Sequence, residues 1–193
     1  MNITSKQLVC IIGLQFSENT PYPEYYIIVH IDDTYTDTTL AVNNKVAFFN
    51  EKQIKLYLRQ KCKFIVNNKR QLLDSLDMVC CLQNILEVIE KRNEDNGAFI
   101  LDYLNTCFDI LQVANIALSD ANKKLLYNFA DHLTFNREFG SYLDENKIDT
   151  QTVIDAIYWL TGAVIFNSFV VTDIEMFGEI NNAVSEYLCT IEN

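Results

Sequence analysis

The spacing of hydrophobic residues changes along this chain, and the N-terminal part has the pattern of β-strands. Two runs rich in β-branched residues, Leu8 to Phe16 and Glu24 to Ile31, come first. Two further runs, Thr38 to Val42 and Lys45 to Phe49, flank Asn43-Asn44, a pair that tolerates the left-handed backbone of a tight turn. These runs predict a small antiparallel sheet of about three to four strands.

A helical period begins after residue 50. Asn50 can cap a helix, with Gln53 three residues later, and the apolar residues from Ile54 to Cys62 fall on one face. The pattern then predicts a short strand from Lys63 to Val66. Beyond Asn67-Asn68 we expect the chain to be helical to its end.

Five to six helices are predicted in this second part. The helix from Thr150 to Phe169 is apolar all round, which is typical of a central helix buried on every side. The last helix begins with a capping box formed by Thr172 and Glu175. The others are expected at Gln71 to Arg92, Ala98 to Leu118, Asp120 to Leu133 behind a Ser119 cap, and Asn136 to Leu143.

These elements predict an α+β fold in which a small N-terminal antiparallel sheet is followed by a mostly helical bundle. We expect one domain over residues 1–193, with a strand-rich part at 1–66 and a helical part at 67–193. The composition is 49% hydrophobic and 21% charged, which is that of a folded chain. Only five Gly and two Pro are present, which favours long helices over a many-turned β-sandwich.

The cysteines and the N-terminus favour a cytoplasmic protein. The N-terminal residues lack the cationic start and long apolar core of a signal peptide. The longest uncharged stretch, Ala156 to Thr172, is short for a membrane span, so no membrane partner is expected. The six cysteines show no Cys-x-x-Cys pair and lie mostly among apolar neighbours, as reduced thiols do: Cys10, Cys62, Cys80, Cys81, Cys107 and Cys189.

Charge is unevenly distributed along the chain. Residues 1–70 contain nine Lys/Arg and six Asp/Glu, a net of +3, whereas residues 71–193 contain six and twenty, a net of −14, which together give the total of −11. After Lys147 seven carboxylates follow with no positive side chain. Because ordinary surfaces mix both signs, this acidity indicates attraction of a cationic partner.

The basic counterpart lies between residues 45 and 70, where eight Lys/Arg stand against Glu51 alone. Lys52, Lys55 and Arg59 share one helical face, as in a nucleic-acid-binding helix. However, the isoelectric point of about 4.5 means that the rest of the surface repels phosphate. We therefore expect no direct nucleic-acid binding, and instead expect this segment to pack against the protein's own acidic helices.

Local patterns that could support catalysis or metal binding are incomplete. His30 and Asp32 share a face if they lie on one strand, and Asp33 follows, but a third group is missing. His132 falls near the end of a helix, where an imidazolium interacts favourably with the helix dipole. We predict no catalytic residues, no metal site and no cofactor, and hence a protein that is not an enzyme.

The stretch from Asp144 to Asp155 partly matches a calcium-binding loop. Asp144 and Asn146 occupy the first and third ligand positions, and Asp155 the twelfth. The match then fails, because Ile148 replaces an oxygen ligand and Asp149 replaces the turn glycine. A capped helix start with solvated acids explains the pattern better.

In size, acidity and the strand–strand–helix stretch from Thr38 to Arg59, the chain resembles the immunity proteins that bacteria make against toxins of contact-dependent growth inhibition and related systems. The resemblance implies a protein that binds a cationic toxin, most simply a nuclease, and blocks its active site. Electrostatic capture followed by burial of apolar anchors would be its mechanism. The candidate partner-binding residues are Asp144, Glu145, Asp149, Glu175, Glu179 and Glu186.

Two alternatives remain open at this point. One is an enzyme or small-ligand protein with a site assembled around His30, Asp32 and Asp33. The other is a helical adaptor or self-associating protein.

Overall fold

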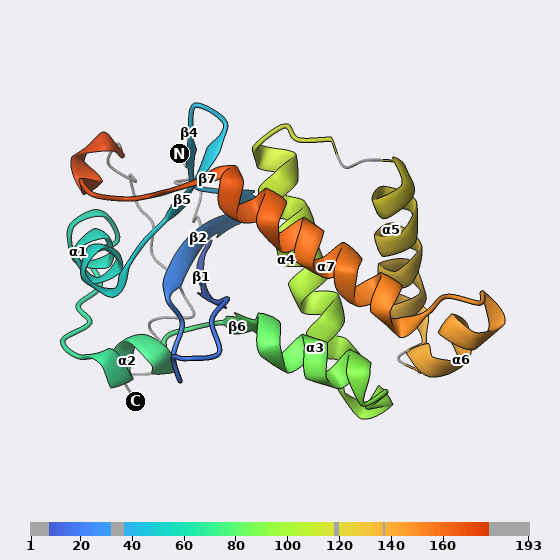
Figure 1. Ribbon diagram of the computed structural model, residues 1–193. Helices are drawn as coiled ribbons and strands as arrows, with labels where there is room; N and C mark the ends of the chain where they lie inside the picture. The colour runs from blue at the N-terminus through green and yellow to red at the C-terminus, as the bar shows by residue number, and fades with distance from the viewer. Residues whose placement is uncertain (1–7, 32–36, 118–119, 137, 178–193) are drawn as a thin grey trace, which may run out of the picture.

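The computed structural model describes residues 8–31, 37–117, 120–136 and 138–177, and its architecture confirms the α+β class (Figure 1). The strands are β1 (Leu8–Gln15), β2 (Tyr25–Ile31), β3 (Asp37–Thr39), β4 (Ala41–Val42), β5 (Lys45–Phe48), β6 (Met78–Cys81) and β7 (Ser168–Val170). The helices are α1 (Glu51–Lys61), α2 (Lys69–Asp74), α3 (Leu82–Glu90), α4 (Gly97–Val113), α5 (Asp120–Phe135), α6 (Phe139–Glu145) and α7 (Thr150–Phe166), with short 3₁₀ turns η1 (Glu94–Asn96) and η2 (Ile174–Met176).

The strands form two mixed sheets rather than one antiparallel sheet. The first has the order β3-β2-β1-β6, in which β1, β2 and β3 are antiparallel neighbours but β6 runs parallel to β1. The second has the order β4-β5-β7, and β7 runs parallel to β5. The parallel strands both come from the part of the chain expected to be helical, which is why the N-terminal pattern alone indicated an antiparallel sheet.

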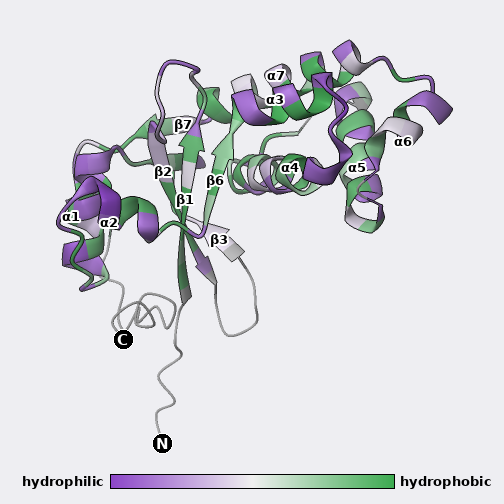
Figure 2. Cartoon of the chain, turned by 90° about the horizontal axis from the view of Figure 1, so that it is seen from below, coloured by the Kyte–Doolittle hydropathy of each residue, from purple (hydrophilic) through white to green (hydrophobic). Residues whose placement is uncertain are grey.

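Two hydrophobic clusters lie on opposite faces of the first sheet. Successive side chains of a strand point to opposite faces. Val9 and Ile11 therefore join a cluster under α1, whereas Ile12 and Leu14 join the larger cluster beneath α3, α4 and α7. Figure 2 shows the result, with α1 and α2 at one end of the molecule and the helical bundle at the other.

The expected helix from Gln71 to Arg92 is wrong in its middle. The chain forms α2, leaves the helix at Ser75, forms strand β6 and re-enters a helix as α3. The Asp77 carboxylate accepts a hydrogen bond from the Ile11 amide at 2.7 Å, and the Asp77 amide donates to the Ile11 carbonyl at 2.9 Å. This long-range pairing decides the structure, because a short apolar run fits a buried strand as well as a helix.

Other boundaries differ over shorter lengths. The expected strand Thr38 to Val42 is divided between the two sheets at Leu40, and Lys63 to Val66 forms no strand. Asn43-Asn44 does adopt the expected left-handed backbone, with φ of 52° and 60°. The Asn50 cap is confirmed, since its side chain accepts the Gln53 amide at 3.0 Å.

The C-terminal end of the described chain also differs from expectation. Residues Ile174–Met176 form only a 3₁₀ turn, and the capping residue is Asp173, whose carboxylate accepts the Glu175 amide at 3.0 Å, rather than Thr172. The remainder of the expected last helix lies outside the described residues.

A buried hydrogen bond sets the rotation of α7 against α4. The Thr161 hydroxyl donates to the Ile157 carbonyl at 2.8 Å, so it accepts from the Tyr103 hydroxyl at 2.7 Å, because it has one proton to give. Tyr103 and Thr161 are both buried. The bond turns Thr161 toward α4 and leaves the opposite side of α7 facing outward.

Removal of this hydrogen bond by Tyr103→Phe should lower the free energy of unfolding by about 1 kcal/mol, the usual net contribution of an internal hydrogen bond. Chemical denaturation of the variant measures the change. Tyr158→Phe removes an exposed hydroxyl from the outer side of α7 and should leave stability unchanged; equal losses in both variants would contradict a special role for the buried bond.

Candidate protein interface

The helix α7 is buried on only one side, which corrects the expectation that it lies at the centre of the core. Its inner residues, such as Val153, Ile157 and Val164, are fully or almost fully buried against the other helices. Large side chains on its outer side are exposed by 39–80%: Tyr158 (52%), Trp159 (39%), Ile165 (49%) and Phe166 (80%). One side of α7 therefore belongs to the core and the other side lies on the surface, although both sides are rich in apolar residues.

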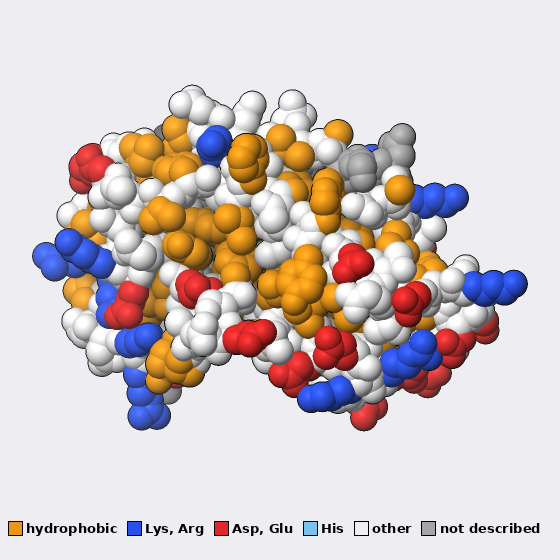
Figure 3. Space-filling model, viewed as in Figure 1, with side chains coloured by type: hydrophobic (Ala, Val, Ile, Leu, Met, Phe, Trp, Pro, Cys, Tyr) orange, Lys and Arg blue, Asp and Glu red, His pale blue; other side chains and the backbone are white. Residues whose placement is uncertain are grey.

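We call this outer surface the α7 face: Tyr158, Trp159, Gly162, Ile165, Phe166 and the neighbouring Val170 of β7, which is also exposed. Figure 3 shows hydrophobic side chains gathered across the middle of this side of the molecule, with Asp and Glu side chains along their lower border. Contiguous exposed apolar surface of this kind marks interaction sites, and Trp and Tyr are enriched at the centres of protein interfaces.

The charged residues of α7 and of the segments next to it in sequence are all acidic. Residues 148–177 contain Asp149, Asp155, Asp173 and Glu175, and no Lys or Arg. The Asp155 carboxylate lies on the exposed side of α7, one turn before Trp159, and accepts the Gln151 side-chain amide at 2.8 Å. Apolar surface next to carboxylates complements a partner that is both apolar and cationic.

The six acidic residues expected to bind the partner do not form one surface. Asp144 and Glu145 end α6, and Asp149 precedes α7, so these three lie near the N-terminal end of that helix. Glu175 lies in η2, beyond the other end of α7 and beside α1 (Figure 1). Glu179 and Glu186 lie outside the described residues.

Two of these acids already have cationic neighbours. Arg92 donates to both carboxylate oxygens of Asp144, at 2.9 and 3.1 Å, from the end of α3. Lys61 lies 3.4 Å from Glu175. The Arg92–Asp144 pair is exposed on both sides, where such ion pairs contribute ~0–1 kcal/mol, so a partner can displace it, whereas the Lys61 side chain is only 9% exposed.

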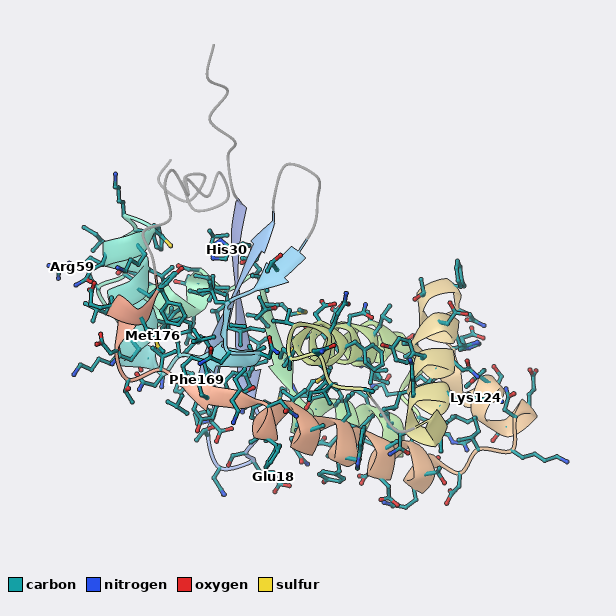
Figure 4. The ribbon with its side chains drawn as sticks, turned by 90° about the horizontal axis from the view of Figure 1, so that it is seen from above. Glu18, His30, Arg59, Lys124, Phe169 and Met176 are labelled. Atoms are coloured by element: carbon teal, nitrogen blue, oxygen red, sulfur yellow. The ribbon has the colours of Figure 1, made fainter. Side chains whose placement is uncertain are left out.

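The basic segment is only slightly covered by the acidic part of the chain. Among the described residues, Lys61 pairs with Glu175 and Arg70 with the nearby Asp74 of α2, while Lys55 and Lys69 pair with Glu51 inside the segment. A groove of about 560 Å³ remains open on α1, lined by Lys52, Lys55, Arg59, Leu56, Val66 and Glu51. Figure 4 places Arg59 at the α1 end of the molecule, far from Lys124 on the bundle.

Of the alternative site at His30, Asp32 and Asp33, the structure describes His30 alone. Burial lowers the pKa of the His30 imidazole, and neither ring nitrogen has a hydrogen-bond partner among the described residues. Asp32 and Asp33 lie outside the described residues. His30 shares its sheet face with Tyr26, whose hydroxyl is also buried with no hydrogen-bond partner in the described part of the chain and whose pKa burial raises to about 12.

His132 has the structural surroundings expected of a helix-end residue. It lies in the last turn of α5, where Nε2 is 2.9 Å from the Glu138 carbonyl oxygen and the ring stacks on Tyr142 at 4.5 Å. In the part of the chain that the structure describes, no group of three or more His, Cys, Asp or Glu side chains could hold a metal ion.

Five cysteines fall within the described residues, and none of them forms a disulfide with another described cysteine. Cys80, Cys81 and Cys107 are buried, as expected for thiols that pack as small hydrophobic side chains. Cys81 and Val79 also line a cleft of about 530 Å³ between β6, α3 and the start of α4, whose other walls carry Asn84, Asn93 and Phe99.

Comparisons with protein-family models, with curated proteins and with solved structures find no match to this chain. Among the described residues, no helix is long and apolar enough to cross a membrane.

The burial of His30 predicts a pH dependence of stability. Because its pKa is lower in the folded chain than in the unfolded one, the unfolded state binds more protons as pH falls below about 6.5, and folding stability is lost in that range. His30→Gln should reduce the loss of stability between pH 7.5 and pH 5.5, measured by urea denaturation at both values. An equal loss in the variant and the original chain would show that His30 is not its source.

Proposed function

We propose that this protein binds and neutralises a cationic protein partner in the cytoplasm, as an immunity protein that blocks the active site of a toxin, most simply a nuclease. The observation that carries the proposal is the α7 face. Four large hydrophobic side chains are held exposed on a helix whose other side is the core of the bundle.

The α7 face has the composition of an interface centre. Trp159 and Tyr158 offer large, rigid contact area at a small loss of side-chain entropy, and such residues dominate binding energies when fully desolvated. Burial of the 80%-exposed Phe166 ring removes apolar surface from water, at about 25 cal/mol per Å². The apolar contact supplies affinity, and the surrounding carboxylates supply selectivity.

Charge favours a cationic partner over a second copy of this chain. Each copy has a net charge of −11, and residues 148–177 contribute no cation that could pair with the carboxylates of another α7 face. A cationic protein would be attracted from a distance, with an association rate that falls as salt screens the field. Active-site clefts that bind nucleic acid are positively charged and match this pattern.

The mechanism is then competition for a cleft. Asp144, Glu145 and Asp149 attract the partner to one end of α7, and the α7 face packs against apolar surface at the mouth of the partner's cleft. While that contact lasts, substrate is excluded. The chain needs no catalytic group for this activity.

The test starts from the partner. Tagged protein is used to capture proteins from its host at low and moderate salt, and each captured cationic protein is expressed alone and together with this chain. Support requires a stoichiometric complex rebuilt from the two purified proteins, together with toxicity that co-expression relieves. Capture of no cationic protein, or of one whose activity this chain leaves unchanged, contradicts the proposal.

Phe166→Ala should weaken that complex at least tenfold, because it removes an exposed apolar anchor from the α7 face. Phe135→Ala is a matched control, since Phe135 is also a highly exposed phenylalanine (85%) at the end of a helix but lies on α5. Isothermal titration calorimetry measures both affinities. The two variants should have similar free energies of unfolding. Equal losses of affinity in both would show that the α7 face is not part of the interface.

Charge reversal should show which end of α7 attracts the partner, because acidic residues lie near both ends. Lys substitutions at Asp144, Glu145 and Asp149 should slow association and weaken its salt dependence, because these residues lie together near the start of α7. Glu175→Lys should have a smaller effect, since Glu175 lies beyond the other end of that helix and already faces Lys61. Stopped-flow association rates at several salt concentrations test which substitution slows association more. A larger effect at Glu175 would place the interface over η2 and α1.

A further inference from the structure

The groove on α1 is cationic, and the described residues neutralise it only in part. Of its three Lys and Arg side chains, Lys55 lies 2.6 Å from the Glu51 carboxylate, which also faces Lys69. Lys52 and Arg59 are exposed, and no ion pair between described residues involves either of them. Two apolar side chains line the groove as well. This lining favours an occupant that is both acidic and apolar.

One segment of the chain itself has this composition. Residues 178–193, which lie outside the described part, contain three Glu and no Lys, Arg or His. Apolar side chains recur among these acids at intervals of three and four residues, as in a segment with one apolar side: Ile180, Val184, Tyr187, Leu188 and Ile191. We call residues 178–193 the acidic segment.

The acidic segment is attached beside the helix that carries the groove. The side-chain amide of Gln53 donates to the Thr172 carbonyl at 2.8 Å, and the Phe177 ring packs edge-on against Tyr57 of α1 with the ring centres 5.8 Å apart. The segment begins at the next residue. Covalent attachment at such a point raises the effective concentration of the segment to about the millimolar range, so a weak contact is sufficient.

The acidic segment is long enough to reach the groove. Gln53 and Lys61, which contact the chain at Thr172 and Glu175, lie roughly half a turn round α1 from Lys55 at ~3.6 residues per turn. Half the circumference of a helix ~10–12 Å across is roughly 16–19 Å, which about five to six extended residues span. About ten residues then remain, against eleven residues in α1.

We propose that the acidic segment docks in the groove on α1, with Glu186 and Glu192 facing Lys52 and Arg59 and its apolar side on the apolar lining. This contact lies within one chain and is independent of the α7 face. A second copy offers the same chemistry but lacks the attachment at Phe177. Nucleic acid also has the required charge, but it is repelled by a chain whose net charge is −11. The docked segment closes the groove to phosphate.

Zero-length carbodiimide cross-linking of the full chain tests the contact, because it joins a lysine amine to a carboxylate only when the two groups touch. Peptide mass spectrometry should find Lys52 or Lys55 joined to Glu186 or Glu192, with a yield that falls several-fold at high salt. Lys124, exposed at the far end of the molecule (Figure 4), is the control and should give no such product. Equal yields at Lys124, or no link to the groove, overturn the proposal.

Isotope labelling separates docking within a chain from docking between chains. Labelled and unlabelled protein are mixed before cross-linking. Links within one chain, with a yield independent of protein concentration, support the proposal. Links formed mainly between labelled and unlabelled chains overturn it in favour of self-association.

Charge reversal tests the pairing. Glu186→Lys with Glu192→Lys should shift the NMR signal of the Leu56 amide, because the segment leaves the groove. Glu90→Lys with Glu138→Lys makes the same change of net charge at exposed positions outside the groove and should leave that signal unchanged. Adding Lys52→Glu and Arg59→Glu to the segment reversal should restore cross-linking between the exchanged charges. Equal shifts in both reversals, or no cross-link in the exchanged variant, overturn the pairing.

A single-stranded oligonucleotide tests the rival occupant. It should shift the Leu56 amide signal several-fold more weakly in the original chain than in a variant with Glu186→Gln and Glu192→Gln, because the docked segment covers the groove. Equal binding to both would show that the groove is open and overturn the proposal. None of these measurements uses a toxin partner, so the proposed function is tested separately by the α7-face variants.

Discussion

The hydrogen bond between Tyr103 and Thr161 determines which side of α7 the molecule shows to its surroundings. The hydrophobic effect is non-directional and distinguishes poorly between the two sides of α7, because the outer side carries large apolar side chains as well as the charged Asp155. The buried hydroxyl pair fixes the rotation of the helix, since turning Thr161 away would leave two buried polar groups unpaired. The aromatic side chains at 158, 159 and 166 are exposed as a consequence.

Strand β1 plays the same organising part for the sheet. Its alternating side chains belong to two different hydrophobic clusters, and its two edges pair with β2 and β6. The anchor at Ile11 and Asp77 fixes the position of β6, and α3 follows β6 without a break. The packing of the bundle on the sheet therefore depends on one parallel strand pair.

Local signals in the sequence predict the elements but not their long-range pairing. The Asn43-Asn44 turn and the Asn50 cap depend on neighbouring residues, and both were predicted from the sequence. Strand β6 was missed because its four residues continue a helix-like period, and only the partner strand 66 residues away decides between the two structures. Sequence periodicity contains no information about such a partner.

The candidate site was missed for a related reason. The acidic residues were visible as charge, but only the structure shows that they divide between the two ends of α7. The aromatic residues were visible as apolar positions, and an all-round apolar helix was interpreted as buried. A signal was available in Gly162, because a glycine in the middle of a long helix lacks a reason in helix propensity.

The residues on the outer side of α7 are not those that would make the helix most stable. A polar outer surface and an alanine at position 162 would suit an isolated helical bundle better, the alanine by roughly 0.5–1 kcal/mol. The chain instead exposes a tryptophan, a tyrosine and a phenylalanine around a bare glycine and gives them only carboxylates as charged neighbours along residues 148–177. Folding explains the inner side of α7, and the proposed binding of a cationic partner accounts for the aromatic and acidic features of its outer side together.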